Sequence, residues 1–348
     1  DLPQGYQISQ YKNPIVGEGY IDIETENNQK RIGIERLHLE QDAGKSLHDQ
    51  DPKYTFVDLN RSGIALMEIV SKPDMNSPEE AVNYVRKVRS ILRYLDTCDG
   101  NMEQGSLRAD VNVSVHKDDE ELGTRCEIKN LNSFKHISSA IIYESKRQIK
   151  LIDSGESVDQ ETRLYDLNSG ETRSMRSKED AHDYRYFPDP DLLPLVLEKE
   201  WIENIKENIP ELPDQKKARF VKEYALSNYD AEVIVSDKAT SEYYETVVKG
   251  RTSKLVTTWV TGELFSVLNK KNILIQDSPV SAHMMGELID NIESGKISNR
   301  LAKDIFEDMC ETGKDSNLII KEKDLSQIID EGEIEKLVDE VLNKNPEN

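Results

Sequence analysis

The chain has 348 residues, of which 36% are hydrophobic and 32% are charged, and its formal net charge is −22. This length is enough for about two domains, and the acidity argues against a free-standing, non-specific nucleic-acid binder, which needs a basic surface. No apolar run approaches the length of a membrane span, so we expect a soluble protein with no membrane partner. Three widely separated cysteines without metal-type spacing indicate a reducing compartment rather than a disulfide framework.

Two strand patterns occur early in the chain, over residues 30–40 and 55–70. Between them, the segment His38–Ser46 contains Glu40 and, after a flexible glycine, Lys45. Acidic groups at a strand end, followed by a glycine and a lysine, suit Mg²⁺ and phosphate contacts. A plain surface turn is an equally good interpretation of these residues.

Glu68 lies within an otherwise apolar run, residues 64–70. A buried carboxylate must be paired, protonated or bound to a metal, because burying it alone is costly. The histidines form no His-x-x-x-His pair, so we expect any metal site to be carboxylate-based, which suits Mg²⁺ better than zinc. The alternative is a strand with Glu68 on its solvent-exposed face.

Two helices are predicted from their N-caps. Ser77 caps the first, Pro78 is its first residue and Glu80 completes a capping box. Ser133 caps the second, which ends near Gly155. The buried stripe of the first helix should consist of Val82, Val85, Val88, Leu92 and Leu95. That of the second should consist of Phe134, Ile137, Ile141, Ile149 and Ile152.

Between these helices, residues 105–115 alternate strictly between apolar and polar side chains, which predicts a half-buried strand. Its polar face presents Arg108 and Asp110, and the segment 124–129 presents Glu127 and Lys129 in the same way. If the two strands pair, their polar faces form one surface rich in carboxylates and cations. The alternative is an ordinary antiparallel hairpin with cross-strand ion pairs.

Arginines and tyrosines alternate further along the chain, and such residues can bind phosphates and stack on bases or form a polar interface between domains. The arginines are Arg163, Arg173, Arg176 and Arg185. A proline-containing segment at 209–214 is a plausible domain boundary. The pattern beyond it is helical over residues 214–226, 238–249, 253–269, 279–294 and 297–312, with a last helix near 333–342.

Six motifs in this order resemble the B-type subunit of the aspartyl/glutamyl-tRNA(Asn/Gln) amidotransferases, and the resemblance covers essentially the whole chain. They are His38–Ser46, Asp58–Gly63 with Glu68–Val70, Asn101–Arg108, Glu127–Phe134, Gln160–Arg163 and Asp183–Pro188. The resemblance implies an α+β fold. Residues 1–208 would form a glutamine-synthetase-like cradle with an antiparallel sheet, lacking its N-terminal part. Residues 209–325 would form an all-α domain, and 326–348 the start of a truncated tail domain.

The resemblance also implies an activity. The family uses ATP and Mg²⁺ to phosphorylate the Glu or Asp side chain esterified to a misacylated tRNA. Ammonia, channelled from an amidase-type glutaminase partner, then displaces the phosphate, and a small third subunit of C-type or fungal F-type completes the complex. Two alternatives stay open: a non-catalytic tRNA-docking scaffold, and a carboxylate–amine ligase acting on a small metabolite.

The resemblance, together with the chemistry of the side chains, gives expected roles for individual residues. The expected metal ligands are Glu40, Gln41, Glu68 and Glu103. The expected catalytic residues are Glu68, Arg108, Asp110 and Lys129. Phosphate contacts are expected from Lys45, Arg176 and Arg185, and channel-lining contacts from Asp110, Glu127 and Lys129.

Gln41 departs from the family pattern, because bacterial members commonly have a metal-binding Glu there. The same segment resembles the mitochondrial branch of the family. We therefore expect the mitochondrial matrix, with the bacterial cytoplasm as the alternative.

Overall fold

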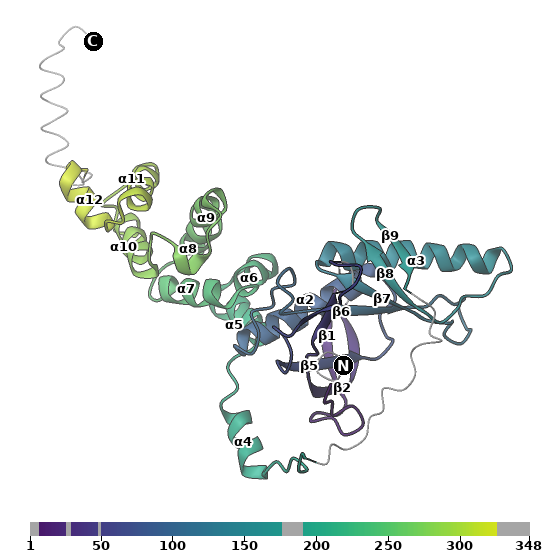
Figure 1. Cartoon of the computed structure of the whole chain (residues 1–348). Coiled ribbons are helices and arrows are strands. Elements are labelled where there is room, and N and C mark those ends of the chain that lie inside the picture. The colour runs from purple at the N-terminus through teal and green to yellow at the C-terminus, as the bar shows by residue number, and fades with distance from the viewer. Residues whose placement is uncertain (1–6, 26–28, 48–49, 176–190, 326–348) are drawn as a thin grey trace, which may run out of the picture. The chain divides into compact units, whose positions relative to one another are not determined.

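The computed structural model describes residues 7–25, 29–47, 50–175 and 191–325 (Figure 1). The chain divides into two compact units, Asp1–Ile209 and Pro210–Asn348. The described part of the first unit contains strands and helices, and that of the second contains helices only. This agrees with an α+β protein. No described helix combines the length and apolarity needed to cross a bilayer.

The first sheet of unit 1 has the strand order β1–β2–β5 and is antiparallel throughout. Its strands are β1 (Gly19–Glu24), β2 (Gln29–Gln41) and β5 (Ala65–Ser71). The strand predicted over 30–40 is confirmed, whereas β1 was not predicted. Ile23 and Ile32 of this sheet are buried against α2.

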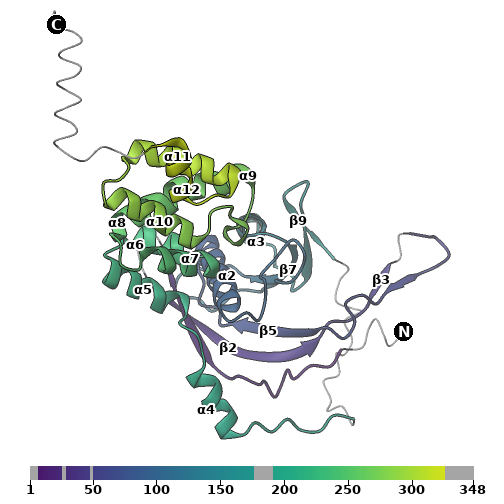
Figure 2. The same cartoon turned by 90° about the vertical axis from the view of Figure 1, so that its left-hand side faces the viewer.

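A short hairpin separates β2 from β5 along the chain. It consists of β3 (Lys45–Leu47) and β4 (Phe56–Asp58), which pair antiparallel as a separate two-stranded sheet. Figure 2 shows this hairpin extending beyond the ends of β2 and β5. The pattern predicted over 55–70 therefore comprises two strands, divided at the turn that contains Gly63, where φ is +81°.

Helix α2 (Pro78–Tyr94) begins where its sequence signal places it. The Ser77 hydroxyl accepts a hydrogen bond from the Glu80 backbone N–H at 3.1 Å, as an N-cap does. The Glu80 carboxylate does not complete the predicted capping box. It accepts a hydrogen bond from the Asn76 N–H and pairs with Lys30 of β2 at 2.8 Å, because that ammonium offers a charged partner.

Helix α3 (Phe134–Asp153) is capped by Ser133 as predicted. Its buried face differs from the prediction, since Ile149 and Ile152 are 48% and 44% exposed. Two polar residues, Glu144 and Gln148, are fully buried instead. They can be buried because Glu144 accepts hydrogen bonds from several side chains, which satisfies its charge.

The second sheet of unit 1 has the order β6–β7–β8–β9. Its strands are β6 (Ala109–Val113), β7 (Cys126–Leu131), β8 (Thr162–Asp166) and β9 (Glu171–Ser174). The predicted pairing of the first two strands is confirmed and is antiparallel. The expectation of a purely antiparallel sheet is wrong, because β7 and β8 run parallel. Helix α3 returns the chain between them, as a parallel connection requires.

After β9, helix α4 (Lys199–Glu207) has no buried residues. The motif Asp183–Pro188 lies outside the described residues, which resume at 191. The all-α prediction is confirmed for the described residues 210–325. The helices are α5 (Pro213–Tyr224), α6 (Asn228–Val235), α7 (Lys238–Val248), α8 (Ser253–Thr258), α9 (Phe265–Lys271), α10 (Ala282–Glu293), α11 (Asn299–Thr312) and α12 (Ser316–Lys323).

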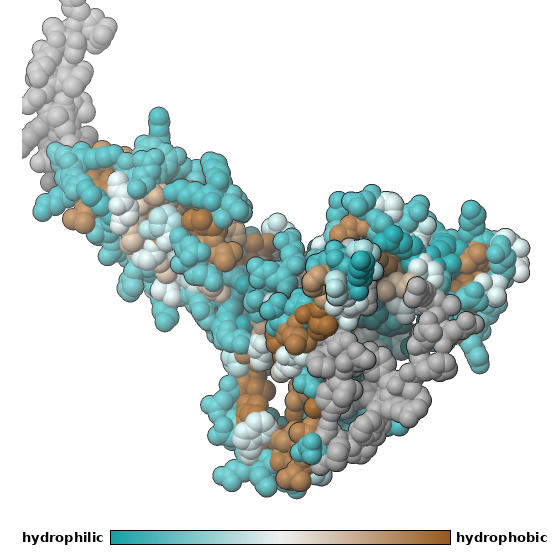
Figure 3. All heavy atoms as spheres, viewed as in Figure 1, coloured by the Kyte–Doolittle hydropathy of each residue, from teal (hydrophilic) through white to brown (hydrophobic). Residues whose placement is uncertain are grey.

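The sequence missed α6 and α12 in this unit. A π-helical segment, η2 (Trp259–Leu264), interrupts the helix predicted over 253–269, and a short 3₁₀ turn, η3 (Ile275–Asp277), follows α9. The helix predicted near 333–342 lies outside the described residues. In Figure 3 the visible face of this unit is mostly hydrophilic, as expected for helices whose apolar faces pack inward.

Glu144→Gln should lower the free energy of unfolding by about 3 kcal/mol, because it removes the charge that faces buried guanidinium groups. Burial alone would raise the pKa of Glu144, but hydrogen bonds from Arg147, Gln148 and Thr172 outweigh burial and lower it below 4.5. The carboxylate therefore stabilises the fold above about pH 4.5, and this contribution is lost as the pH falls through the lowered pKa.

Urea unfolding of the two proteins at several pH values measures the effect. The difference between wild type and variant should shrink at acidic pH. Lys146→Ala, an exposed position on the same helix, is the control. A difference that is independent of pH would show that the charge of Glu144 is not what stabilises this region.

Candidate functional site

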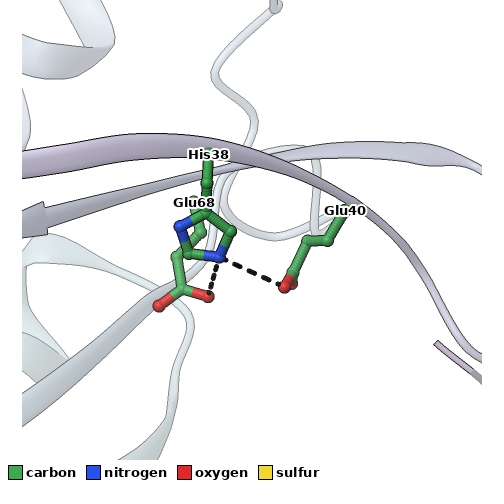
Figure 4. A group of neighbouring side chains, drawn as sticks. All are labelled: His38, Glu40 and Glu68. Carbon is green, nitrogen blue, oxygen red and sulfur yellow. Dashed lines mark ion pairs between the residues drawn. The ribbon is translucent and has the colours of Figure 1, made fainter. Parts of the chain in front are cut away.

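The register of β2 against β5 brings three potential metal ligands together. His38 lies directly opposite Glu68, and Glu40 follows two residues along β2 on the same face. His38 Nε2 is 3.4 Å from Glu68 Oε2 and 3.6 Å from Glu40 Oε2 (Figure 4). We call these three residues the carboxylate–histidine cluster, and their ligand atoms all lie within 4.8 Å of one another.

The cluster combines a buried base with two close carboxylates. His38 is 1% exposed, and its Nδ1 has no hydrogen-bond partner among the described residues. The side chain of Glu40 is 14% exposed and that of Glu68 is 51% exposed. The expectation that Glu68 is buried is therefore wrong, and the alternative of a strand with Glu68 on its exposed face is confirmed. Burial raises the pKa of Glu40, and the neighbouring charge of Glu68 raises it further. A cation between the two carboxylates would relieve this repulsion.

The donor set fits a divalent cation. Two carboxylate oxygens suit Mg²⁺ or Mn²⁺, and an imidazole nitrogen is more usual for transition metals than for Mg²⁺. His38 was not among the expected metal ligands, because it has no second histidine at the spacing of a His-x-x-x-His pair. His38 could have been identified only from its position opposite Glu68 on the neighbouring strand, and that position depends on the strand register.

The structure brings together two of the four expected metal ligands. Gln41 immediately follows Glu40 and so lies on the opposite face of β2. The Gln41 side chain lies beside the turn that contains Gly63. Its Oε1 would be 3.8 Å from a Cβ atom added to that glycine. Glu103 is exposed in the turn region that precedes β6. Neither residue joins the carboxylate–histidine cluster.

The expected channel residues meet on the polar face of the second sheet. Lys129 Nζ lies 3.2 Å from Asp110 Oδ2 and 3.5 Å from Glu127 Oε1. Burial lowers the pKa of Lys129, but the two carboxylates outweigh burial and raise it above the ordinary value. The ammonium therefore stays charged at neutral pH. The Lys129–Asp110 pair confirms a cross-strand ion pair, whereas Glu127 and Lys129 lie on the same strand, and this geometry is compatible with either interpretation of the hairpin.

The expected phosphate contacts have different positions. One terminal guanidinium nitrogen of Arg108 donates a hydrogen bond to Asp42 Oδ2 at 3.0 Å. Lys45 is exposed on β3, opposite Asp58. Arg176 and Arg185 lie outside the described residues.

Arg163 is not available to a ligand. It is 8% exposed, donates hydrogen bonds to Thr172 and contacts Glu144 Oε2 at 3.3 Å. Arg173 is exposed and lies 3.9 Å from Asp166 across the β8–β9 pair.

Known families match both units of the chain. The GatB/GatE catalytic domain matches residues 1–203, and the GatB domain matches residues 242–348. A protein of Granulibacter bethesdensis is 60% identical over 348 residues, covering all of this chain and 72% of the relative. A protein of Pelagibacter ubique is 58% identical over 352 residues with the same coverage. One of Methylobacterium nodulans is 60% identical, covering all of this chain and 71% of its own length.

Each of these relatives is named as the B-type subunit of an aspartyl/glutamyl-tRNA(Asn/Gln) amidotransferase. The chain belongs to this family, which confirms the resemblance found in the sequence motifs. The name designates the relatives as one component of an amidation enzyme with several subunits. These relatives are bacterial, so the expectation of a mitochondrial protein has no support among them.

Glu68→Gln and His38→Gln should each weaken divalent-cation binding by about tenfold or more, because each removes a ligand of the cluster. Titration of the protein with Mn²⁺, followed by electron paramagnetic resonance, measures the affinity, and Mg²⁺ competition measures the affinity for that ion. Glu35→Gln is the matched control, since Glu35 lies on β2 with 53% side-chain exposure, close to the 51% of Glu68. Unchanged Mn²⁺ affinity in Glu68→Gln would exclude the cluster as the metal site.

Proposed function

We propose that this chain catalyses ATP-dependent phosphorylation of the Glu or Asp side chain esterified to a misacylated tRNA, and its amidation by ammonia. The observation that supports this most directly is the convergence of Glu40 and Glu68 with His38 on one face of the first sheet. A carboxylate oxygen is a poor leaving group, so ammonia cannot displace it until phosphorylation makes it a better one. Phosphoryl transfer in turn needs positive charge around the transferring group.

In this proposal Glu40, Glu68 and His38 hold Mg²⁺, which when bound neutralises charge on the phosphates. Gln41 and Glu103 are not part of the proposed ligand set, because they lie away from the cluster. Arg108 and Lys45 contact phosphate oxygens, with Arg108 better placed to do so because Asp42 orients it. ATP is the phosphoryl donor.

Asp110, Glu127 and Lys129 are proposed to line the ammonia path. Ammonia must arrive unprotonated, because ammonium has no lone pair with which to attack. Lys129 keeps its own proton, since two carboxylates hold it in the charged form. The Lys129–Asp110 pair therefore provides a polar lining in which both charges are already matched.

We further propose the architecture and partners of this protein. Residues 1–208 form a glutamine-synthetase-like cradle, 209–325 a helical domain and 326–348 part of a tail domain. An amidase-type glutaminase partner supplies ammonia, a small third subunit completes the complex, and the substrate is a misacylated tRNA. Because the relatives named above are bacterial, we place the complex in the bacterial cytoplasm.

Glu68→Gln should abolish ATP-dependent conversion of Glu-tRNA(Gln) to Gln-tRNA(Gln) in the complex reconstituted with its amidase-type partner. Without this ligand the phosphoryl group cannot be transferred, whereas glutamine hydrolysis by the partner continues. The assay follows aminoacyl-tRNA identity, phosphate release and glutamate release together, with Glu35→Gln as the control.

Equal conversion by Glu68→Gln and wild type would contradict the role of the cluster. No conversion by wild type under any condition would favour a tRNA-docking scaffold over a catalytic role.

Asp110→Asn combined with Lys129→Met should lower amidation by about tenfold or more while ATP-dependent phosphate release persists, because the ammonia path loses its matched polar lining. Free ammonium chloride added in place of glutamine separates delivery from chemistry, since it bypasses a path through the protein. Wild-type amidation rates with glutamine in the double variant would exclude these residues from the path.

A further inference from the structure

A second charged cluster links the two sheets of unit 1. The Asp42 side chain accepts hydrogen bonds from two arginines at the same oxygen, Oδ2. Arg61 Nε lies 2.8 Å away, and one terminal nitrogen of Arg108 lies 3.0 Å away. We call Arg61 and Arg108 the guanidinium pair.

Main-chain hydrogen bonds fix the position of Asp42. Its N–H donates to the Ile64 carbonyl at 2.8 Å, and its own carbonyl accepts from the Gly63 N–H at 2.9 Å. These bonds close the base of the β3–β4 hairpin beside the ends of β2 and β5. The Asp42 side chain is only 14% exposed, so it has little freedom to move away from the arginines.

Arg61 also donates to the Gly105 carbonyl at 3.3 Å, in the segment that leads into β6. The guanidinium pair thus joins the turn before β5 to the start of β6. Asp42 follows Glu40 by two residues, and Arg108 precedes Asp110 by two. Two residues of extended chain span at most about 7 Å, so the backbones of Asp42 and Arg108 each lie within that distance of a proposed functional residue, Glu40 and Asp110.

The guanidinium pair has more positive charge than its carboxylate can neutralise. Two guanidinium groups share one carboxylate, which leaves one net positive charge in a chain whose total is −22. The side chains of Arg61 and Arg108 are 43% and 52% exposed. Each guanidinium has five N–H donors in a planar arrangement that matches phosphate oxygens, so donors beyond those bound to Asp42 can reach a ligand.

We infer that the guanidinium pair binds the terminal phosphate of a nucleoside triphosphate, and that Asp42 is the positioning residue that orients both arginines toward it. This inference rests on the proposed function. In the step it serves, a substrate carboxylate oxygen forms a bond to the terminal phosphorus. The bond from that phosphorus to the bridging oxygen breaks, and the diphosphate leaves with the electron pair. No proton transfer or other reactant is needed for this balance.

The first experiment compares binding of ATP and ADP to the reconstituted complex carrying Arg61→Ala or Arg108→Ala. Loss of charge-assisted hydrogen bonds to the terminal phosphate should lower ATP affinity by about tenfold or more, with a much smaller effect on ADP. Arg31→Ala is the matched control, because Arg31 makes a similar exposed pair with Asp22, at 2.8 and 3.0 Å, on β1 and β2. An unchanged ratio of ATP to ADP affinity in both variants would overturn the inference.

The second experiment tests Asp42 through Asp42→Asn, which keeps the shape but removes the negative charge. If Asp42 positions the arginines, kcat should fall about 10- to 100-fold because the phosphate is held in the wrong geometry. KM for ATP should not rise, because the cluster has gained net positive charge. Wild-type kcat, or a parallel loss of ATP affinity and thermal stability, would overturn the positioning role.

Failure of this inference can be distinguished from failure of the proposed function. If wild type amidates Glu-tRNA(Gln) but the arginine variants keep the ATP to ADP ratio, only the inference is wrong. If wild type does not amidate while the ratio still depends on Arg61 and Arg108, the proposed function is wrong and the phosphate site stands.

Discussion

The antiparallel register of β2 and β5 sets the relative positions of His38, Glu40 and Glu68. Successive residues in a strand point to opposite faces, so a shift of one residue would move Glu68 away from His38. Two features hold the register. A β-bulge between Ile34 and Arg36 lies near one end of the pairing, which continues beyond it to Ile34 and Ser71, and the main-chain bonds between Asp42 and the 63–64 turn close the other end. The candidate metal centre therefore depends on backbone hydrogen bonds that none of its side chains makes.

The sequence indicates the parts of this site that depend on local pattern. Glu68 is conspicuous because it interrupts an apolar run, and the alternation around Asp110 indicates its exposed face. His38 could not be identified in this way, because its partner Glu68 is far away in the chain and is chosen by register. Gln41 shows the opposite case. The family resemblance made it an expected ligand, although strand alternation alone already places Glu40 and Gln41 on opposite faces.

Helix α3 shows a different limit of sequence patterns. The apolar period predicts burial of Ile149 and Ile152, because isoleucine is usually inside. The buried positions are instead taken by Glu144 and Gln148, whose partners include Arg147 on the same helix and Thr172 on β9. A pattern measured along one helix cannot include hydrogen bonds from a strand that follows it. The parallel pairing of β7 with β8 was missed for the same reason, since it depends on where α3 returns the chain.

The acidity of the chain opposes the binding of anionic substrates only at long range. At physiological ionic strength, exposed charges more than about 8 Å apart are largely screened. A nucleotide bound as proposed would therefore respond mainly to the groups beside it, which are the guanidinium pair, Lys129 and the carboxylate–histidine cluster. The carboxylate–histidine cluster repels phosphate most strongly, because Glu40 and Glu68 are both carboxylates, whereas Lys129 offsets one of the two carboxylates beside it. A divalent cation bound there would cancel the two negative charges of Glu40 and Glu68. In the proposed site, metal binding and nucleotide binding should therefore favour each other, and this coupling would let a strongly acidic chain hold a polyanionic substrate.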